Sequence, residues 1–331
     1  MTKFKALVVS EAAENQYVRE VQERSVEELP AGEVLIRVRY SSLNYKDALS
    51  ASGNRGVTRR YPHTPGIDAA GEVAASDSDR FKPGDKVLCC CYNLGMNLPG
   101  GFGQYIRVPA EWVMLCPEGL SLGEAMMYGT GGFTAALSVE KLIGHGVGPD
   151  AGKVLVTGAT GGVGSLSVAI LAKAGFQVVA ASGKSDQAEF LRHLGAAEVV
   201  GREAVTDKKG LALLKGKWAG VIDTVGGEIL ATALKSVKYG GVVTCCGNVA
   251  SPELATTVYP FILRGVSLVG IEAAECDMAT RERVWAMLAG PWRIDTIADM
   301  VVEVGLAELS ARIESMLAGR HRGRIVVNLD R

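Results

Sequence analysis

The sequence predicts an α/β protein that combines a doubly wound, parallel Rossmann sheet with a second, β-rich domain. Three observations support this fold class. Strand and helix patterns alternate from residue 153 to residue 246, which is typical of βαβ units and a parallel sheet. A glycine-rich stretch directly follows the first strand of that series. The first third of the chain instead contains short strands separated by turns, which indicates a partly closed barrel.

The alternating series begins with Lys153–Thr157, an apolar run that reads as a buried strand. Val163–Ala174 follows as a helix, and Gly175 stands at a position typical of a helix C-terminus. The series continues with strands at Gln177–Ala181, Glu198–Val200, Ala219–Asp223 and Gly240–Cys246 and with helices at Ser185–Leu194 and Glu228–Val237.

The segments on either side of this series are built differently. Phe4–Val9 and Glu33–Tyr40 are strand-like, and Glu124–Leu142 is helix-forming with an interruption at Gly129–Gly132. The last third predicts helices at Thr280–Ala289 and Leu306–Leu317 and a closing strand at Arg324–Leu329. We expect this end to return to the first domain. Residues 1–122 and 290–331 would then form the β-rich domain, and residues 123–289 the Rossmann domain.

Composition narrows the class of function. A chain of 331 residues is long enough for two domains. Lys and Arg total 35 against 36 Asp and Glu, so charge gives no reason to expect nucleic acid or an anionic membrane as a partner. No run of 18 apolar residues is present, and the short apolar stretch near the N-terminus reads as a first strand. Seven cysteines, three of them consecutive, suit a reducing cytoplasm better than a disulfide framework.

The glycine-rich stretch has the spacing Gly158-x-x-Gly161-x-x-Gly164 between the predicted strand and helix. Glycines allow a tight turn and a close approach of the backbone to a pyrophosphate, and a helix N-terminus supplies free N–H groups. The spacing is not the strict G-x-G-x-x-G, and a structural turn is the alternative. Because the strand and the helix are both present, we interpret the loop Gly158–Gly164 as a dinucleotide phosphate site.

The end of the next strand indicates which dinucleotide binds. NAD enzymes place a carboxylate about 20 residues after the glycine loop to bind the ribose 2′-hydroxyl. This chain has Ser182, Gly183 and Lys184 there instead, and Arg202 follows the third strand. A hydroxyl and cations suit a 2′-phosphate, so the sequence predicts NADPH, although each cation taken alone reads equally well as solvated surface charge.

The sequence predicts no metal. Its four histidines, at positions 63, 145, 193 and 321, show no ligand spacing. The consecutive residues Cys89, Cys90 and Cys91 cannot provide the C-x2-C geometry that tetrahedral zinc favours. We interpret them as small residues of a buried strand.

With these parts in this order, the chain resembles the medium-chain dehydrogenase/reductase superfamily along essentially its full length. The stretch Pro65–Gly71 stands where zinc alcohol dehydrogenases of the superfamily carry G-H-E-x-x-G. Ile67 takes the position of the metal-binding His and Asp68 that of the Glu. The four-cysteine zinc lobe is also missing. Both departures resemble the zinc-free branch of quinone oxidoreductases and enoyl reductases, whose first domain is GroES-like.

Within that branch the chain is similar to the acrylyl-CoA reductase family. The segments that carry this resemblance are Ser41–Leu49, Pro65–Asp68, Gly129–Ala135, Gly161–Ser165, Trp218–Gly226 and Pro260–Val266. The resemblance implies NADPH-dependent reduction of acrylyl-CoA to propionyl-CoA and a homodimer joined by sheet edges near Val266–Ile271. It also implies cofactor contacts from Tyr45, Thr160, Gly161, Gly162, Val163, Gly164, Ser182, Gly183, Lys184, Arg202, Asn248, Ile262 and Arg324. The family often has Arg where this chain has Lys184. Lysine keeps the positive charge but cannot form the bidentate hydrogen bonds of a guanidinium.

Candidate catalytic residues follow from the reaction that the resemblance implies. Hydride transfer to an enoyl thioester develops negative charge on oxygen, which needs hydrogen-bond donors. Tyr45 would lie at the nicotinamide end, either as proton donor or as a positioning group while solvent supplies the proton. Asn44 either orients a carbonyl or holds a turn, and Asp68 either acts directly or structures the pocket. Arg59-Arg60 could meet phosphates of CoA, although a solvated surface pair is the better interpretation.

Two other functions stay open at this stage. Quinone or alkenal reduction with NADPH fits the same zinc-free site. A non-catalytic NADPH-binding role is also known in this branch, but the Asn44-Tyr45-Lys46-Asp47 segment argues against it.

Overall fold

The computed structural model describes residues 2–331, which divide into two compact units. Unit 1 contains residues 2–130, 274–289 and 297–331, and unit 2 contains residues 131–273 and 290–296. The domain boundaries that the sequence predicts lie at 122/123 and 289/290, and they remain a proposal. The assignment of residues 274–289 to unit 1 has a clear physical basis, because the buried guanidinium of Arg281 donates to the main-chain oxygen of Cys90 at 3.1 Å.

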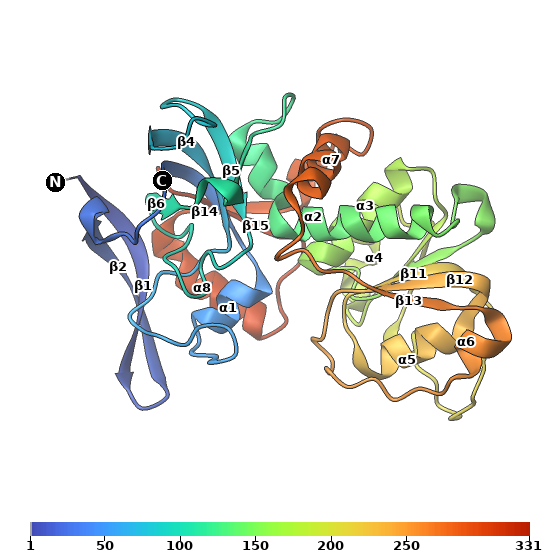
Figure 1. Ribbon diagram of the computed structural model, residues 1–331. Coiled ribbons are helices and arrows are strands. Elements are labelled where there is room, and N and C mark those ends of the chain that lie inside the picture. The colour runs from blue at the N-terminus through green and yellow to red at the C-terminus, as the bar shows by residue number, and fades with distance from the viewer. Residues whose placement is uncertain (1) are drawn as a thin grey trace. The chain divides into compact units, whose positions relative to one another are not determined.

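Unit 1 is built on a mostly antiparallel sheet with the order β14-β15-β3-β4-β5-β7, and β6 also pairs with β3 (Figure 1). Its apolar core lies against this sheet and includes Val38, Leu43 and Phe102. The strands are β3 (Val34–Leu43), β4 (Asp68–Ser76), β5 (Lys86–Cys90), β6 (Tyr105–Val108), β7 (Val113–Leu115), β14 (Val301–Val304) and β15 (Arg324–Asn328).

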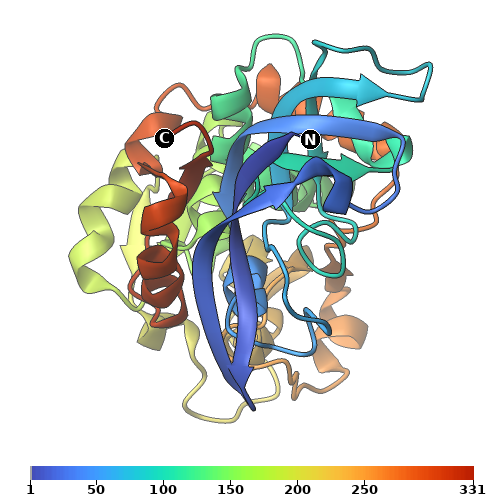
Figure 2. The ribbon, with the colours of Figure 1, turned by 90° about the vertical axis from the view of Figure 1, so that its left-hand side faces the viewer.

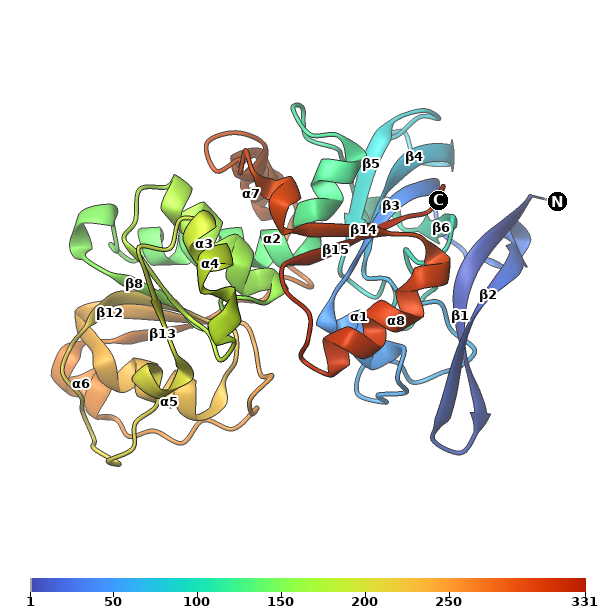
Figure 3. The ribbon, with the colours of Figure 1, turned by 180° about the vertical axis from the view of Figure 1, so that it is seen from behind.

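The N-terminal segment forms a separate two-stranded sheet, β1 (Lys3–Ala13) with β2 (Gln16–Ser25), a long hairpin seen in Figure 2. Backbone bonds tie β1 to the rest of unit 1, because Leu7 donates to Phe102 and Val9 to His63. Figure 3 shows α8 (Leu306–Leu317) beside α1 (Tyr45–Ser50). Helix α7 (Met278–Ala289) completes the unit.

Unit 2 has a six-stranded parallel sheet with the order β10-β9-β8-β11-β12-β13. This order reverses between β8 and β11, which is the topological switch point of the Rossmann fold. The strands are β8 (Val154–Val156), β9 (Val178–Ala181), β10 (Glu198–Val200), β11 (Trp218–Asp223), β12 (Val237–Cys245) and β13 (Ser267–Gly270). Helices α3 (Gly162–Lys173) and α4 (Ala188–His193) cover one face of the sheet, and α5 (Gly227–Ser236) and α6 (Tyr259–Arg264) the other (Figure 1).

The structure confirms the predicted fold class. The helix expected over 124–142 is present as α2 (Leu122–Gly144), and its expected interruption is a break at Gly129, where φ is 51° and ψ is −155°. The closing helix runs over Leu306–Leu317 as predicted, and the final strand starts at Arg324. All seven cysteines are free, which agrees with the absence of a disulfide framework. Among residues 2–331, no helix is long and apolar enough to cross a membrane.

Candidate active site

The glycine loop in unit 2 connects β8 to α3 through a very tight turn. Gly158 has a positive φ of 58°, a conformation that glycine adopts without strain. Gly164 faces the start of the same loop, and a Cβ there would fall inside contact distance of the Gly158 oxygen and 2.8 Å from the Cα of Ala159. The helix begins at Gly162, and its first backbone hydrogen bond runs from the N–H of Ser165 to the Gly161 oxygen. The N–H groups of Gly162, Val163 and Gly164 precede that bond, at the helix end where N–H groups lack intrahelical partners. The loop is therefore a cradle of backbone donors that suits a phosphate group.

A buried carboxylate supports this loop from the neighbouring strand. Asp223, the last residue of β11, accepts hydrogen bonds from Thr157 Oγ1 at 2.7 Å and from the N–H of Gly226 at 2.7 Å. The hydroxyl of Thr224 donates to the Thr157 oxygen and packs against Gly158. Burial raises the pKa of Asp223. The sequence analysis assigned no role to Asp223. The only signal for such a role is that an acidic residue ends β11, the strand beside the topological switch point.

The predicted 2′-phosphate residues gather at the carboxyl ends of β9 and β10. Ser182 Oγ accepts the N–H of Lys184 at 3.0 Å and lies 3.4 Å from Thr160 Oγ1. The guanidinium of Arg202 lies against Gly183, with Nη2 only 2.8 Å from where a Cβ would stand. Burial lowers the pKa of Lys184, and Asp186 opposes that shift. Two cations and a hydroxyl around a small turn form a donor set that fits a 2′-phosphate.

Two other predicted cofactor residues of unit 2 lie elsewhere. Asn248 is exposed in the loop that follows β12. Ile262 lies on α6, where 68% of its surface is exposed. The structure thus brings together Thr160, Ser182, Gly183, Lys184 and Arg202, while the roles of Asn248 and Ile262 stay predictions.

In unit 1 the predicted catalytic segment forms the start of α1. Asn44 precedes the helix, and Tyr45, its first residue, is 38% exposed. Asp47 is fully buried and accepts the N–H groups of Asn44 at 2.8 Å and Ile67 at 2.8 Å. Burial and then the nearby charge of Asp68 raise the pKa of Asp47 to about 7, although these backbone donors oppose the shift. Asp47 therefore joins the α1 start to the strand that carries Asp68.

Asp68 is the centre of a buried polar cluster. Its carboxylate accepts hydrogen bonds from Ser42 Oγ at 2.5 Å, Asn44 Nδ2 at 2.8 Å, Thr130 Oγ1 at 2.6 Å and the N–H of Thr130 at 3.0 Å. Arg324, only 2% exposed, donates from Nη2 to Ser42 Oγ at 2.7 Å and from Nη1 to Asn44 Oδ1 at 3.1 Å. Asn44 thus contacts both Asp68 and Arg324, and Ser42 links Arg324 to Asp68. Sequence analysis gave no role to Ser42 or to Thr130.

The break in α2 makes room for this cluster. A Cβ on Gly129 would lie 2.5 Å from Ser42 Oγ, 2.6 Å from Asp68 Oδ2 and 2.9 Å from Arg324 Nη2. The thiol of Cys91 lies 3.0 Å from Thr130 Oγ1. Burial and then Asp68 raise the pKa of Cys91 to about 11, so it remains a thiol at neutral pH. Cys91 therefore extends the cluster as a neutral hydrogen-bonding group and not as a nucleophile.

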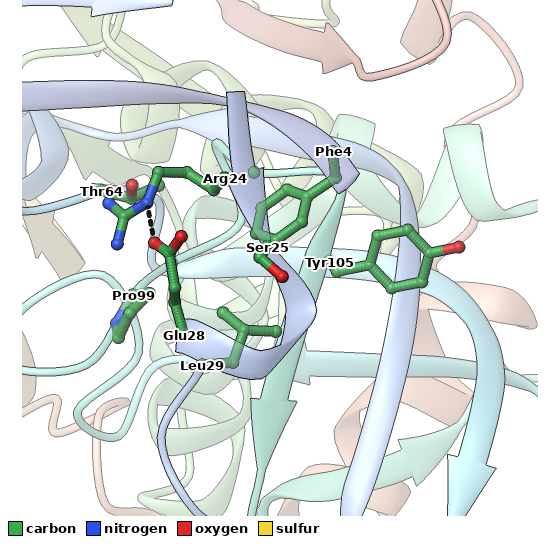
Figure 4. Close-up of a pocket in the computed structure, with 10 residues that line it drawn as sticks. Phe4, Arg24, Ser25, Glu28, Leu29, Thr64, Pro99 and Tyr105 are labelled. Atoms are coloured by element: carbon green, nitrogen blue, oxygen red, sulfur yellow. Dashed lines mark hydrogen bonds and ion pairs between the residues drawn. The ribbon is translucent and has the colours of Figure 1, made fainter. Parts of the chain in front are cut away.

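Two pockets lie apart from these clusters. The one in Figure 4, between the N-terminal hairpin and the 99–105 segment of unit 1, holds about 20 Å³, which is room for one water molecule. Arg24 and Glu28 pair beside it at 2.6 Å. A pocket of about 300 Å³ in unit 2 is lined by Asp207, Glu228 and Lys235 among others. None of the predicted site residues lines either pocket.

Residues 2–331 contain no group of three or more His, Cys, Asp or Glu side chains that could hold a metal ion. Ile67, which takes the place of the metal-binding His, is buried and apolar. The absence of a metal from the active protein stays a prediction.

Comparison with known proteins places this geometry in a family. The alcohol dehydrogenase GroES-like domain model matches residues 30–118, and the zinc-binding dehydrogenase model matches residues 162–289. The chain is 45% identical to "Putative quinone oxidoreductase YhfP" of Bacillus subtilis over 99% of both chains. It is 42% identical to "Acrylyl-CoA reductase AcuI" of Ruegeria pomeroyi, again over 99% of both chains.

Solved structures agree with these relatives. The yhdH oxidoreductase of Salmonella enterica, in complex with NADP, has a TM-score of 0.95 and 40% identity, covering 98% of this chain and 99% of that one. Bacillus subtilis protein yhfP, with NAD bound, has a TM-score of 0.97 and 44% identity, covering 99% of this chain and 100% of that one. This chain is an oxidoreductase of the medium-chain dehydrogenase/reductase superfamily and belongs to the family that contains acrylyl-CoA reductase AcuI and the quinone oxidoreductase-like YhfP.

Proposed function

We propose that this protein reduces the carbon–carbon double bond of a short 2-enoyl-CoA with NADPH, with acrylyl-CoA as substrate and propionyl-CoA as product. The observation that carries this proposal is the 42% identity to an acrylyl-CoA reductase over 99% of both chains. The buried polar cluster around Asp68 supports it, because this cluster holds the amide of Asn44, and a developing oxyanion needs a preorganised donor. The seven free cysteines suit the reducing cytoplasm that we propose as its location.

The proposal assigns the cofactor to the donors of unit 2. The glycine loop would hold the pyrophosphate, and Ser182, Lys184 and Arg202 the 2′-phosphate. Among the relatives of known structure, the yhdH oxidoreductase of Salmonella enterica was solved in complex with NADP and Bacillus subtilis yhfP with NAD bound. Two cations without a strand-end carboxylate favour NADPH here.

We expect Lys184→Ala to weaken NADPH binding at least tenfold while NADH affinity changes less than threefold, because only NADPH carries the 2′-phosphate. Fluorescence titration with each cofactor measures both affinities. Lys173→Ala is a matched control, because it removes a cation that pairs with Asp295 on the surface of the same unit. Equal losses for both cofactors in the Lys184 variant would contradict the assignment.

The proposed chemistry needs three contributions. When bound, NADPH supplies the hydride for the β-carbon of the enoyl thioester. Negative charge then develops on the thioester oxygen, and the amide of Asn44 is the side-chain donor that we assign to it. Tyr45 lies next to Asn44 and is partly exposed, so either its phenol or water can deliver the proton to the α-carbon. Asp68, the third candidate residue, contacts Asn44 directly.

The alternative functions predict different turnover. A quinone or alkenal reductase of the same family would reduce those electrophiles faster than any enoyl-CoA, and a non-catalytic protein would bind NADPH and reduce none of them. Following NADPH oxidation side by side with acrylyl-CoA, crotonyl-CoA and a simple quinone separates the three. We expect the highest kcat/KM with acrylyl-CoA. Faster turnover of the quinone would replace our proposal with the first alternative.

We also propose that the protein forms a homodimer through the β13 edge of its sheet. β13 ends the strand order, and Leu268 on it is 37% exposed, close in sequence to Leu263, which is 57% exposed. An exposed strand edge with apolar neighbours invites pairing with a second copy. We expect Leu268→Lys to shift the sedimentation coefficient from dimer to monomer at micromolar concentration, whereas Val18→Lys on the hairpin leaves it unchanged. A monomeric wild-type protein would refute this proposal.

A further inference from the structure

We propose that Asp68 and Arg324 are positioning residues that fix the side-chain amide of Asn44 in one orientation, so that an N–H of this amide, and not its oxygen, is presented to a substrate oxygen. The Asn44 amide contacts an anion at one end and a cation at the other. Nδ2 lies 2.8 Å from Asp68 Oδ2, and Oδ1 lies 3.1 Å from Arg324 Nη1.

These two contacts make the two orientations of the amide unequal. The reverse orientation would place the Asn44 oxygen against the carboxylate of Asp68 and its NH2 group against the guanidinium of Arg324. Both contacts would then be repulsive. In a buried site, a polar group without a matching partner costs more free energy than it does in water. The observed orientation uses one N–H of Asn44 for Asp68. Nδ2 also makes two long contacts with Ser42, at 3.4 Å to its main-chain oxygen and 3.5 Å to its Oγ, and we infer that a substrate oxygen replaces these long contacts.

The same hydrogen bonds exclude Asp68 from direct acid–base chemistry. An ionised carboxylate offers about four lone-pair sites. Ser42 Oγ, Asn44 Nδ2, Thr130 Oγ1 and the Thr130 N–H supply four donors to it. No lone pair is left to take a proton from a substrate or from water. Asp68 therefore acts through Asn44.

Two series of hydrogen bonds lead to the carboxylate of Asp68, one through Ser42 and one through Thr130. Ser42 accepts from Arg324 at 2.7 Å and donates to Asp68. Thr130 donates its hydroxyl proton to Asp68, so the thiol of Cys91 is the donor in the Cys91–Thr130 contact. Hydrogen bonds aligned in this way strengthen one another in a low-dielectric site. Burial lowers the pKa of Arg324, while Asp68 and Asp47 raise it. The charges of Arg324 and Asp68 thus favour each other, and Ser42 joins the two side chains by hydrogen bonds.

The catalytic part of this inference rests on the proposed function, whereas the coupling between Asn44 and Asp68 does not. The test is a double-mutant cycle of Asp68→Asn, Asn44→Asp and the exchange Asn44→Asp/Asp68→Asn, with thermal unfolding, NADPH affinity by fluorescence and steady-state kinetics with acrylyl-CoA. The exchange keeps the charge of the cluster and restores a donor–acceptor pair between positions 44 and 68. It removes the N–H that would face the substrate.

We expect each single variant to lower Tm by roughly 5 °C or more, and the exchange to recover at least half of that loss. We expect kcat to fall at least tenfold in all three variants, the exchange included, with NADPH affinity within twofold of wild type. Ser41→Ala is the matched control, because Ser41 donates only to the main-chain oxygen of Asp68, at 2.6 Å. Its kcat should stay within twofold of wild type.

Three outcomes separate the claims. Additive losses of Tm, with no recovery in the exchange, would overturn the coupling whatever the substrate proves to be. Recovery of both Tm and kcat in the exchange would overturn the donor role of Asn44. Recovery of Tm in a protein whose wild type reduces no enoyl-CoA would support the coupling while refuting the proposed function.

If Asp68→Asn fails to fold, Arg324→Lys tests the same point. Lysine keeps the charge but cannot donate to Ser42 and Asn44 in the fixed fork of a guanidinium. A fall in kcat of at least tenfold with unchanged NADPH affinity would support the positioning role. Weaker NADPH binding with unchanged kcat would overturn it in favour of a direct cofactor contact by Arg324.

Discussion

Gly164→Ala is expected to lower NADPH affinity at least 50-fold. A Cβ at this position would fall inside contact distance of the Gly158 oxygen and 2.8 Å from two other backbone atoms of the loop. No flexible side chain is available to yield, so α3 must move away from the loop and carry its N-terminal donors with it. Overpacking of this kind also costs about 1–3 kcal/mol of stability.

Fluorescence titration with NADPH and thermal unfolding together measure this effect. Gly148→Ala is the matched control, because a Cβ there meets no heavy atom within 4 Å and its φ of −93° suits any residue. We expect the control to bind NADPH like wild type. A Gly164→Ala protein that binds NADPH within threefold of wild type would show that the loop does not hold the phosphates.

Asp223→Ala is expected to be the most destabilising substitution in unit 2 outside its apolar core. It leaves Thr157 Oγ1 and the N–H groups of Val225 and Gly226 without their buried acceptor. The free energy of unfolding should fall by about 2–4 kcal/mol, because buried donors then lose their partners. The turn that begins α5 and the loop at Gly158 should both loosen, so we also expect NADPH affinity to fall at least tenfold.

Denaturant unfolding followed by circular dichroism measures the stability, and the same fluorescence titration measures the affinity. Thr244→Val is a matched control, because this equally buried residue of the neighbouring strand makes one long side-chain bond, at 3.3 Å to the Val221 oxygen. Thr244→Val should lower the free energy of unfolding by less than about 1 kcal/mol. A loss in Asp223→Ala no larger than in this control would contradict the supporting role of Asp223.

The grouping of the residues that we propose for the cofactor could be predicted from the sequence because its signals are local. The strand, the glycines and the helix of the loop lie within about twenty residues, and parallel strands bring their carboxyl ends to one edge of a sheet. Ser182, Lys184 and Arg202 therefore gather as the strand order requires. Asp223 lies at the same edge, but the buried hydrogen bond that it accepts from Thr157 has no counterpart in a local sequence pattern.

The cluster around Asp68 could not be assembled from the sequence. Arg324 and Asn44 are 280 residues apart, and their contact depends on the pairing of β15 with β3. Asp68 joins them because β4, which begins at Asp68, also pairs with β3. Register shifts between β3 and β4 decide which side chains meet, and no sequence pattern fixes them. Strand β2 was missed for a different reason, because none of its residues is buried and it lacks the apolar alternation of a core strand.

The central claim is the transfer of hydride from NADPH to the β-carbon of an enoyl-CoA, and isotope transfer tests it most directly. With NADPH carrying deuterium at both C4 positions and acrylyl-CoA in ordinary water, we predict propionyl-CoA with one deuterium on the β-carbon and none on the α-carbon. Mass spectrometry and NMR of the product locate the label. Propionyl-CoA without β-deuterium, or no propionyl-CoA from an enzyme that oxidises NADPH with a quinone, would contradict the account.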